Sequence, residues 1–210
     1  MRVAVLDYGA GNLHSIGKAL EAAGAEVVVT ADARAASRAP AVVLPGVGAF
    51  GAAAARLASG RDALRAALAA GTPCLGVCLG MQLLFASSEE GPGEGLGLIP
   101  GRVRRLAARR VPHIGWNAIE DARDPALAAA GLVHAYYANG FVCAPDDPAC
   151  VVAWSVHEGD RFPAAVRAGR TLGVQFHPEK SSRAGLALVR AWLDEARAGA
   201  ARRAAAPEAP

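Results

Sequence analysis

The first half of the chain alternates short apolar runs with longer segments in which apolar residues recur every three or four positions. Helical spacing follows Asn12, which can cap a helix that ends at Gly24, and it returns over residues 51–70 with a break at Gly60. Strands that alternate with helices are typical of βαβ units and of a parallel sheet. The short runs predict strands at 3–6, 26–29, 41–44 and 73–77.

The second half has shorter β signals separated by Pro, Asp and Gly turns, which indicates antiparallel or mixed pairing. These signals lie at 101–106, 115–119, 139–143, 151–156 and 163–166. A last strand at 172–174 and a helix over about 183–197 close the fold. The residues beyond that helix have no apolar periodicity. We therefore expect one α/β domain over 1–199 and a disordered tail over 200–210.

Composition narrows the class of protein. The 210 residues suit one domain, and a content of 53% hydrophobic and 20% charged residues is that of a soluble globular protein. A net charge of +3 is too small to indicate a nucleic-acid-binding surface. No apolar run is long enough for a signal peptide or a membrane span. Four cysteines without the dense spacing of a secreted disulfide scaffold favour a reducing compartment, so we expect a cytoplasmic protein.

The most informative stretch is the predicted strand that ends in Gly-Val-Cys-Leu-Gly and then continues into a helical pattern through Phe85. A strand, a tight turn and a helix form a nucleophile elbow, with Gly76 and Gly80 giving room around Cys78. The helix N-terminus favours a thiolate there, and the Leu79 N–H would face a developing oxyanion. The alternative from this motif alone is that Cys78 is a small buried apolar residue.

A cysteine nucleophile needs a base, and only one of the five histidines has a built-in orienting group. In His177-Pro178-Glu179 the proline disfavours helix at His177, so we expect His177 and Glu179 to be extended and to point to the same side. Glu179 could then hold one imidazole nitrogen while the other faces the thiol of Cys78. The motif follows a predicted strand, which would bring it to the same sheet edge as Cys78.

Two glycine-rich loops give weaker signals. Residues 45–48 read Pro-Gly-Val-Gly after a predicted strand, so this loop could supply a second oxyanion N–H or be a plain turn. Residues 9–14 begin like a dinucleotide fingerprint but carry His14 where the third glycine belongs, although Asp32 follows about twenty residues on. A metal or redox centre is not indicated, because neither a Cys-x-x-Cys pair nor a matching histidine cluster is present.

Three motifs together resemble those of the class I (triad) glutamine amidotransferases. They read Gly-Val-Cys-Leu-Gly-Met-Gln at 76–82, Gln-Phe-His-Pro-Glu-Lys-Ser at 175–181 and Pro-Gly-Val-Gly at 45–48. Within that family the chain is most similar to the glutaminase subunits of imidazole glycerol phosphate synthases, which act in histidine biosynthesis. Matching segments lie at 5–13, 44–50, 87–91, 95–99, 112–117 and 180–182.

The resemblance implies a flavodoxin-like α/β fold, in which helices flank a mostly parallel sheet and an antiparallel or mixed β region is added in the second half. It implies that L-glutamine is hydrolysed through a thioester on Cys78, with His177 as the proton shuttle and Glu179 orienting His177. No cofactor and no metal are implied. By the same resemblance, the oxyanion and the glutamine are held by Val47, Gly48, Leu79, Gln82, Glu90, Gly140 and Phe141.

The resemblance also implies a protein partner. Ammonia would pass to a separate (β/α)8-barrel cyclase subunit in a heterodimer, and Trp116, Asn117 and Lys180 match positions near that interface. One segment departs from the family pattern, because residues 136–141 read Tyr-Tyr-Ala-Asn-Gly-Phe instead of Tyr-Phe-Val-His-Ser-Tyr. The family contacts glutamine there largely through the backbone, so we expect activity to be retained without the usual side-chain hydrogen bonds.

Other functions remain compatible with the sequence. The chain could be the glutaminase of another synthase, such as one for vitamin B6 or anthranilate, or a catalytically silent binding module with the same fold. The intact set of Cys78, His177 and Glu179 argues against the silent module, which has no physical need of all three. A nicotinamide-binding Rossmann protein is the weakest alternative.

Overall fold

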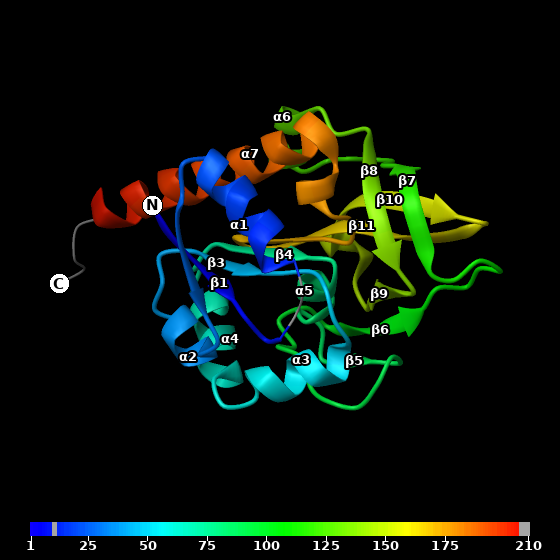
Figure 1. Cartoon of the computed structure of the whole chain (residues 1–210), viewed down its shortest axis with the longest axis horizontal. Helices are drawn as coiled ribbons and strands as arrows, with labels where there is room; N and C mark the ends of the chain where they lie inside the picture. Colours follow the sequence, from blue (N-terminus) through cyan, green and yellow to red (C-terminus); the bar gives the residue numbers. More distant parts are fainter. Residues whose placement is uncertain (10–11, 206–210) are drawn as a thin grey trace.

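A seven-stranded sheet forms the centre of the structure, a computed structural model that describes residues 1–9 and 12–205. Its strands are β1 (Arg2–Leu6), β2 (Glu26–Thr30), β3 (Val42–Leu44), β4 (Cys74–Val77), β10 (Val151–His157), β11 (Asp160–Ala168) and β12 (Thr171–Val174). They lie in the order β10-β11-β12-β4-β3-β1-β2 (Figure 1). The strands from β12 to β2 run parallel, whereas β10 and β11 extend the sheet as antiparallel neighbours.

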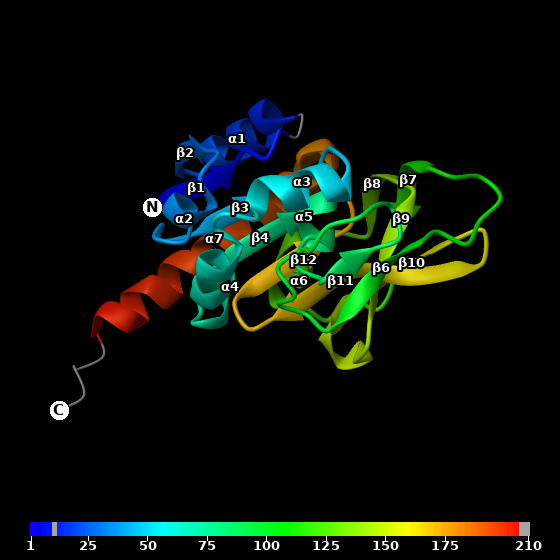
Figure 2. The ribbon, with the colours of Figure 1, turned by 90° about the horizontal axis from the view of Figure 1, so that it is seen from below.

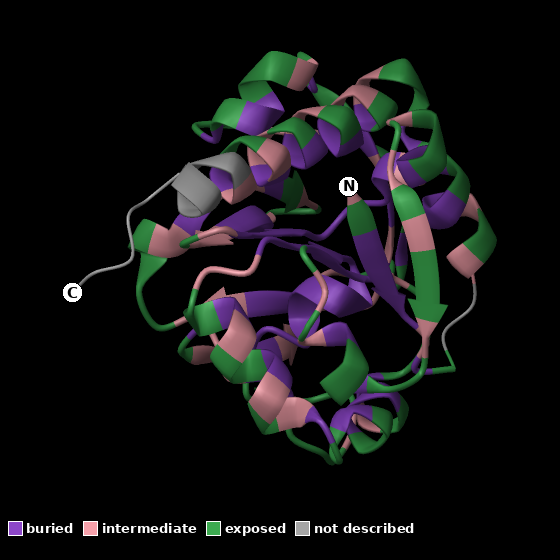
Figure 3. Cartoon of the chain, turned by 90° about the vertical axis from the view of Figure 1, so that its left-hand side faces the viewer, coloured by how far each residue is buried: buried purple, intermediate pink, exposed green. Residues whose placement is uncertain are grey.

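Helices cover both faces of this sheet. One face carries α1 (Leu13–Ala22), α6 (Pro125–Ala130) and α7 (Ser182–Ala205), and the other carries α2 (Ala33–Ala36), α3 (Phe50–Leu57) and α4 (Arg61–Ala69) (Figures 1 and 2). Neighbouring strand residues point to opposite faces: Val3 packs in one cluster with Ile16 and Trp192, and Ala4 packs in the other with Phe50. Figure 3 shows the buried residues gathered along the sheet and the inner sides of the helices. Burial on both faces explains the continuous apolar runs of the parallel strands.

Two smaller sheets stand beside the central one (Figure 1). The first contains β5 (Ser87–Ser88), β6 (Gly101–Arg105) and β9 (Phe141–Pro145), and the second contains β7 (His113–Ala118) and β8 (His134–Asn139). The remaining short elements are α5 (Leu79–Gln82), η1 (Pro148–Cys150) and η2 (Pro178–Lys180). Gly140 separates β8 from β9, so the chain passes from one small sheet to the other at this residue.

The predicted parallel strands of the first half are all present, as are the helices on either side of Gly60 and the strands of the β10 to β12 region. The fold class is therefore confirmed. The strand expected at 139–143 is wrong: it is two strands that meet at Gly140, because β8 pairs with β7 and β9 pairs with β6. Five short elements, α2, α6, β5, η1 and η2, were not predicted, nor was most of β8.

Two predicted helices have other bounds than expected. The helical pattern after Cys78 ends at Gln82, because the Leu84 and Phe85 N–H groups bond to carbonyls only three residues back. The last helix continues to Ala205 instead of ending near residue 197, so the tail expected over 200–210 is helical up to that point. Residues 206–210 lie outside the described residues. Among the helices of the described part, none combines the length and apolar character needed to cross a bilayer.

Asp124 ties α6 to the sheet, and its removal should destabilise the fold. Its buried carboxylate caps α6 by accepting the Ala126 N–H (2.9 Å) and also accepts Arg167 Nε on β11 (2.8 Å). Asp124→Ala removes the cap and takes away one carboxylate from a largely buried guanidinium. We expect the free energy of unfolding, measured by urea titration, to fall by about 2–3 kcal/mol.

Asp194→Ala is the matched control, because Asp194 pairs with Arg197 on the exposed side of α7 (3.1 Å). Its loss should change the free energy of unfolding by less than about 0.5 kcal/mol. Equal losses in the two variants would contradict the structural role of Asp124.

Candidate functional site

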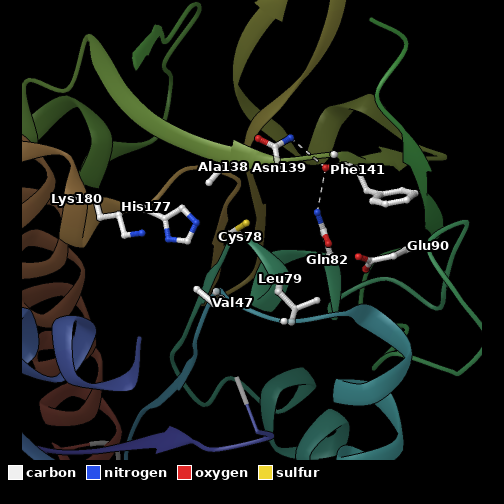
Figure 4. A pocket seen from close by; sticks show the side chains of 13 residues that line it. Val47, Cys78, Leu79, Gln82, Glu90, Ala138, Asn139, Phe141, His177 and Lys180 are labelled. Carbon is white, nitrogen blue, oxygen red and sulfur yellow. Dashed lines mark hydrogen bonds between the residues drawn. The ribbon is translucent and has the colours of Figure 1, made fainter. Parts of the chain in front are cut away.

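A pocket of about 310 Å³ opens at the carboxyl ends of β3, β4 and β12, next to the chain between β8 and β9 (Figure 4). This sheet edge is where ligands bind in doubly wound α/β folds. Most of the residues singled out in the sequence line it: Val47, Gly48, Cys78, Leu79, Gln82, Glu90, Gly140, Phe141, His177 and Lys180. Glu179 is buried behind His177, and Trp116 and Asn117 lie outside the pocket lining.

Cys78 occupies a strained turn between β4 and α5. Its φ of 48° lies in the region that favours glycine. The turn can form because its neighbours have no side chain: a Cβ on Gly80 would lie 1.9 Å from the Leu44 carbonyl oxygen. A Cβ on Gly76 would lie 2.8 Å from the Gly80 carbonyl oxygen. The expected packing role of both glycines is confirmed, and it places Cys78 on the floor of the pocket.

The helix after Cys78 contributes less than expected. With bounds of Leu79–Gln82, α5 is a single turn and aligns few peptide dipoles toward the sulfur. The Leu79 N–H, as the first of this turn, has no acceptor inside the helix and lies beside the pocket. Two side chains, those of His177 and Gln175, also approach the Cys78 sulfur.

The first of these side chains is His177. It is buried at the end of β12, its Nδ1 contacts Glu179 Oε1 at 2.9 Å, and its ring lies beside Cys78 in the pocket (Figure 4). Burial alone would lower the pKa of His177, but the interactions with Cys78 and Glu179 outweigh burial and raise that pKa to about 9. The imidazole is therefore protonated at neutral pH.

The local backbone around His177 differs from the expectation. His177 itself is extended, but Pro178–Lys180 forms a 3₁₀ turn, so His177 and Glu179 do not alternate as strand residues. Bonds from the Lys180 N–H (3.0 Å) and the Ser181 hydroxyl (2.7 Å) to the His177 carbonyl hold this turn. The turn folds the Glu179 carboxylate back onto Nδ1, and the pairing expected from the sequence is thus made by a different geometry.

Asn12 is a second neighbour of Glu179. The sequence predicts a different role for it, as the cap of the first helix. Its side chain caps no N–H of α1, which corrects the capping expectation, and its φ is 70°. Instead, Asn12 Nδ2 donates to Glu179 Oε1 at 2.8 Å, across 167 residues of sequence. The same carboxylate oxygen thus accepts from both Asn12 and His177, and this holds Glu179 in one orientation.

Gln175 is a site residue that sequence reasoning missed. It is fully buried, its Nε2 donates to Cys78 Sγ at 3.5 Å, and its Oε1 accepts from Gln82 Nε2 at 3.3 Å. Gln82 Nε2 also donates to the Phe141 carbonyl at 3.0 Å (Figure 4). The sequence does hold a signal for this role, because the polar Gln175 stands between the apolar residues Val174 and Phe176 at the end of a buried strand.

The remaining pocket residues are held by backbone contacts. Glu90 Oε2 accepts the Phe50 N–H at 2.8 Å, which fixes the start of α3 beside the 45–48 loop. In that loop Gly48 has a φ of 138°, a conformation that favours glycine. Asn139, in the segment that departs from the family pattern, donates from Nδ2 to the Phe141 carbonyl at 3.1 Å (Figure 4). The pocket wall at residues 139–141 is thus held largely through one carbonyl.

Two of the three residues expected near a partner, Lys180 and Trp116, are linked through Tyr136 along a path that leads away from the pocket. Lys180 Nζ lies 5.7 Å from the ring centre of Tyr136, and the Tyr136 and Trp116 rings meet edge to face at 6.3 Å. Trp116 is exposed, as is Ile114 on the same strand. Asn117 is engaged within the chain, since its Nδ2 donates to the Val156 carbonyl at 2.9 Å.

The described residues offer little for a metal or a dinucleotide. No group of three or more His, Cys, Asp or Glu side chains in that part of the chain could hold a metal ion. Of the residues in the dinucleotide-like start, Gly11 lies outside the described residues. Asp32, the expected ribose ligand of that alternative, caps α2 by accepting the Arg34 N–H at 2.8 Å.

Comparisons with known proteins agree with the resemblance seen in the sequence. A family model described as Glutamine amidotransferase class-I matches residues 4–195. Imidazole glycerol phosphate synthase subunit HisH of Halobacterium salinarum is 46% identical over 202 residues, which cover 91% of this chain and 92% of the relative. The subunit of the same name from Symbiobacterium thermophilum is 48% identical over 198 residues, which cover 91% and 92%.

Solved structures share the fold at lower sequence identity. A structure described as a glutamine amidotransferase superposes with a TM-score of 0.72 at 23% identity and covers 93% of this chain and 98% of its own. The structure of PurLQS from Thermotoga maritima gives a TM-score of 0.72 at 19% identity, with coverage of 92% and 98%. These likenesses concern the arrangement of the chain and agree with the sheet and helices described above.

The raised pKa of His177 predicts the effect of a charge change at Glu179. In Glu179→Gln the carboxylate that favours the imidazolium is lost, so the pKa of His177 should fall from about 9 by about one to two units. Titration of isotope-labelled histidine by NMR measures this. Glu90→Gln makes the same charge change in the pocket without touching His177 and should leave its titration in place. If the titration midpoint of His177 stayed near 9 in Glu179→Gln, the contact between Glu179 and His177 would not be the cause of the raised pKa.

Proposed function

The chain belongs to the class I glutamine amidotransferases, and from this premise we propose that it is the glutaminase subunit of an imidazole glycerol phosphate synthase. It hydrolyses L-glutamine and delivers ammonia to a cyclase subunit. The observation that carries the proposal is the buried contact of Glu179 with His177, and of His177 with Cys78, at the floor of the pocket. The relatives at 46% and 48% identity support this synthase over one for vitamin B6 or anthranilate.

In the first half-reaction, the Cys78 thiolate attacks the carboxamide carbon of glutamine. The protonated His177 gives its proton to the amide nitrogen as the carbon–nitrogen bond breaks, so ammonia leaves and a thioester remains on Cys78. The raised pKa of His177 supports this step, because it keeps the proton donor charged at neutral pH. Glu179 stabilises that charge and fixes the ring.

In the second half-reaction, His177 is neutral and takes a proton from water, whose oxygen attacks the thioester carbon. The carbon–sulfur bond then breaks, the new carboxylic acid loses its proton to solvent and leaves as glutamate, and the thiolate and imidazolium are restored. Apart from the substrate, only Cys78, His177 and water change their protonation or bonding in the cycle.

Two sets of residues would hold the substrate. The Leu79 N–H supplies one oxyanion donor, and the Val47–Gly48 segment supplies the second after a backbone adjustment that glycine at 48 permits. Gln82, Glu90, Gly140 and Phe141 line the rest of the pocket and hold the glutamine. Asn139, Gly140 and Phe141 replace the family's usual His, Ser and Tyr, and the backbone of this segment makes the contacts to glutamine.

We place the docking surface of a (β/α)8-barrel cyclase subunit around Trp116 and Lys180, with Asn117 next to Trp116 on β7 but with its side chain turned toward the Val156 carbonyl. Ile114 and Trp116 are 65% and 54% exposed, and they point to the same face because they lie two residues apart on β7. Large exposed apolar side chains that lie together are typical of protein contacts. Lys180 joins this surface to the pocket, so ammonia released at Cys78 has a short path to the partner.

We also infer that the protein works in a reducing compartment such as the cytoplasm. All four cysteines are free thiols, and three of them are buried, Cys78 included. Oxidation of Cys78 would remove the nucleophile. Fractionation of cells should find the chain with cytoplasmic markers, and its recovery with exported proteins would overturn this inference.

Cys78→Ala tests the proposed reaction. The rate of glutamine-dependent synthesis by the complex should fall at least about a thousandfold in this variant. Among the residues that the structure describes, no other cysteine lines the pocket. Synthesis from added ammonia should be unchanged, since the cyclase subunit performs that step. Glutamine hydrolysis that survives in the variant would show that Cys78 is not the nucleophile.

Trp116→Ala tests the docking surface. The dissociation constant for the purified cyclase subunit, measured by calorimetry, should rise about tenfold or more. Val29→Ala is the matched control, because Val29 is 53% exposed on β2, an edge strand of the central sheet. A dissociation constant that changes in neither variant, or equally in both, would move the docking surface elsewhere.

A further inference from the structure

A chain of three hydrogen bonds connects the wall of the pocket to the Cys78 sulfur. It starts at the Phe141 carbonyl, passes through the amide of Gln82 (3.0 Å) and the amide of Gln175 (3.3 Å), and ends at Cys78 Sγ (3.5 Å). We call this chain the amide relay. The catalytic steps derived above use Gln82 only as a substrate contact and do not use Gln175 at all.

The direction of the relay follows from its first member. A main-chain carbonyl can only accept, so the Phe141 oxygen requires the N–H₂ end of Gln82 to face it. The same nitrogen has a second proton, and this proton bonds to Gln175 Oε1. With its oxygen committed, Gln175 can turn only its N–H₂ end toward the sulfur of Cys78. The backbone of Phe141 thereby ensures that a donor faces Sγ.

The surroundings of Gln175 make this donor effective. Gln175 is fully buried, and its own N–H bonds to the Ala164 carbonyl of β11 at 2.9 Å, so both ends of the residue are fixed. In a buried setting, a hydrogen bond to a charged acceptor is stronger than one between neutral groups. An N–H directed at sulfur favours the thiolate over the thiol, and α5, with its single turn, offers little of this support.

We propose that Gln175 is a positioning residue that stabilises the Cys78 thiolate and, through the same amide, fixes the orientation of Gln82. This inference rests on the proposed glutaminase function. His177 and Gln175 both follow β12 and lie beside the same sulfur, where the charged imidazole of His177 faces it and the neutral amide of Gln175 donates to it. The relay leaves Gln82 Oε1 available to the substrate. One hydrogen-bonded unit therefore fixes both the donor that faces the Cys78 sulfur and the amide that contacts the substrate.

Gln175→Met tests the proposal, because methionine has a similar length and cannot donate a hydrogen bond. Alkylation of Cys78 by iodoacetamide is followed against pH, with mass spectrometry of the Cys78 peptide to separate it from the other cysteines. The pH of half-maximal rate should move upward by about one unit, as expected for the loss of one hydrogen bond to a charged group. In the complex, kcat for glutamine should fall about tenfold or more.

Thr171→Val is the matched control on the same strand. Thr171 is fully buried at the start of β12, and its hydroxyl has no partner, so the change leaves the relay intact. Its alkylation midpoint should equal that of the parent protein. If Gln175→Met fails to fold, as judged by thermal melting, Gln175→Leu replaces it in the same measurement.

The outcomes separate the two proposals. An alkylation midpoint that does not move in the Gln175 variant overturns the relay, even if kcat falls, because a merely structural defect would lower kcat alone. The alkylation measurement needs no glutamine. A parent protein that hydrolyses no glutamine in the presence of the cyclase subunit would overturn the proposed function and leave the test of the relay valid.

Discussion

The hydrogen bond from the Cys78 N–H to the Val174 carbonyl (2.7 Å) determines where the groups of the site meet. It continues the parallel pairing of β4 with β12, in which Val77 lies opposite Val174. Because of this register, the chain leaves β4 at Cys78 and leaves β12 toward Gln175 and His177 at the same edge of the sheet. A slip of one residue would reverse the side chains of β12 and carry both donors away from the sulfur.

The side chains that meet at this sheet edge form a buried polar cluster. Most of them are hydrogen-bonded to residues that are far away in sequence. Glu179 receives Asn12 from the N-terminal segment as well as His177, and Gln175 receives Gln82 from α5. Such a cluster is costly unless its members are paired, so each contact restricts the others. On the proposed mechanism, the sulfur and the imidazole are therefore held next to each other before a substrate arrives.

The sequence was informative wherever a signal is local. The strand before Cys78, its flanking glycines and the His177-Pro178-Glu179 motif lie in short stretches, and so their meeting at one sheet edge could be predicted. Asn12 could not be assigned to Glu179, because asparagine before a helix has a local alternative as a cap. The one-turn length of α5 and the break at Gly140 depend on pairing with other segments. The direction of the Gln175 amide depends on a carbonyl in β9, which no local pattern encodes.

In the proposed reaction, Cys78, activated by His177 and positioned by the sheet register, forms a covalent bond to the glutamine carboxamide carbon. This bond is tested by the mass of the Cys78 peptide after the complex with the cyclase subunit reacts with an electrophilic glutamine analogue. We expect one adduct per chain, on Cys78, and protection by L-glutamine. Absence of this adduct, or labelling of Cys74, Cys143 or Cys150 in its place, would show that Cys78 is not the nucleophile.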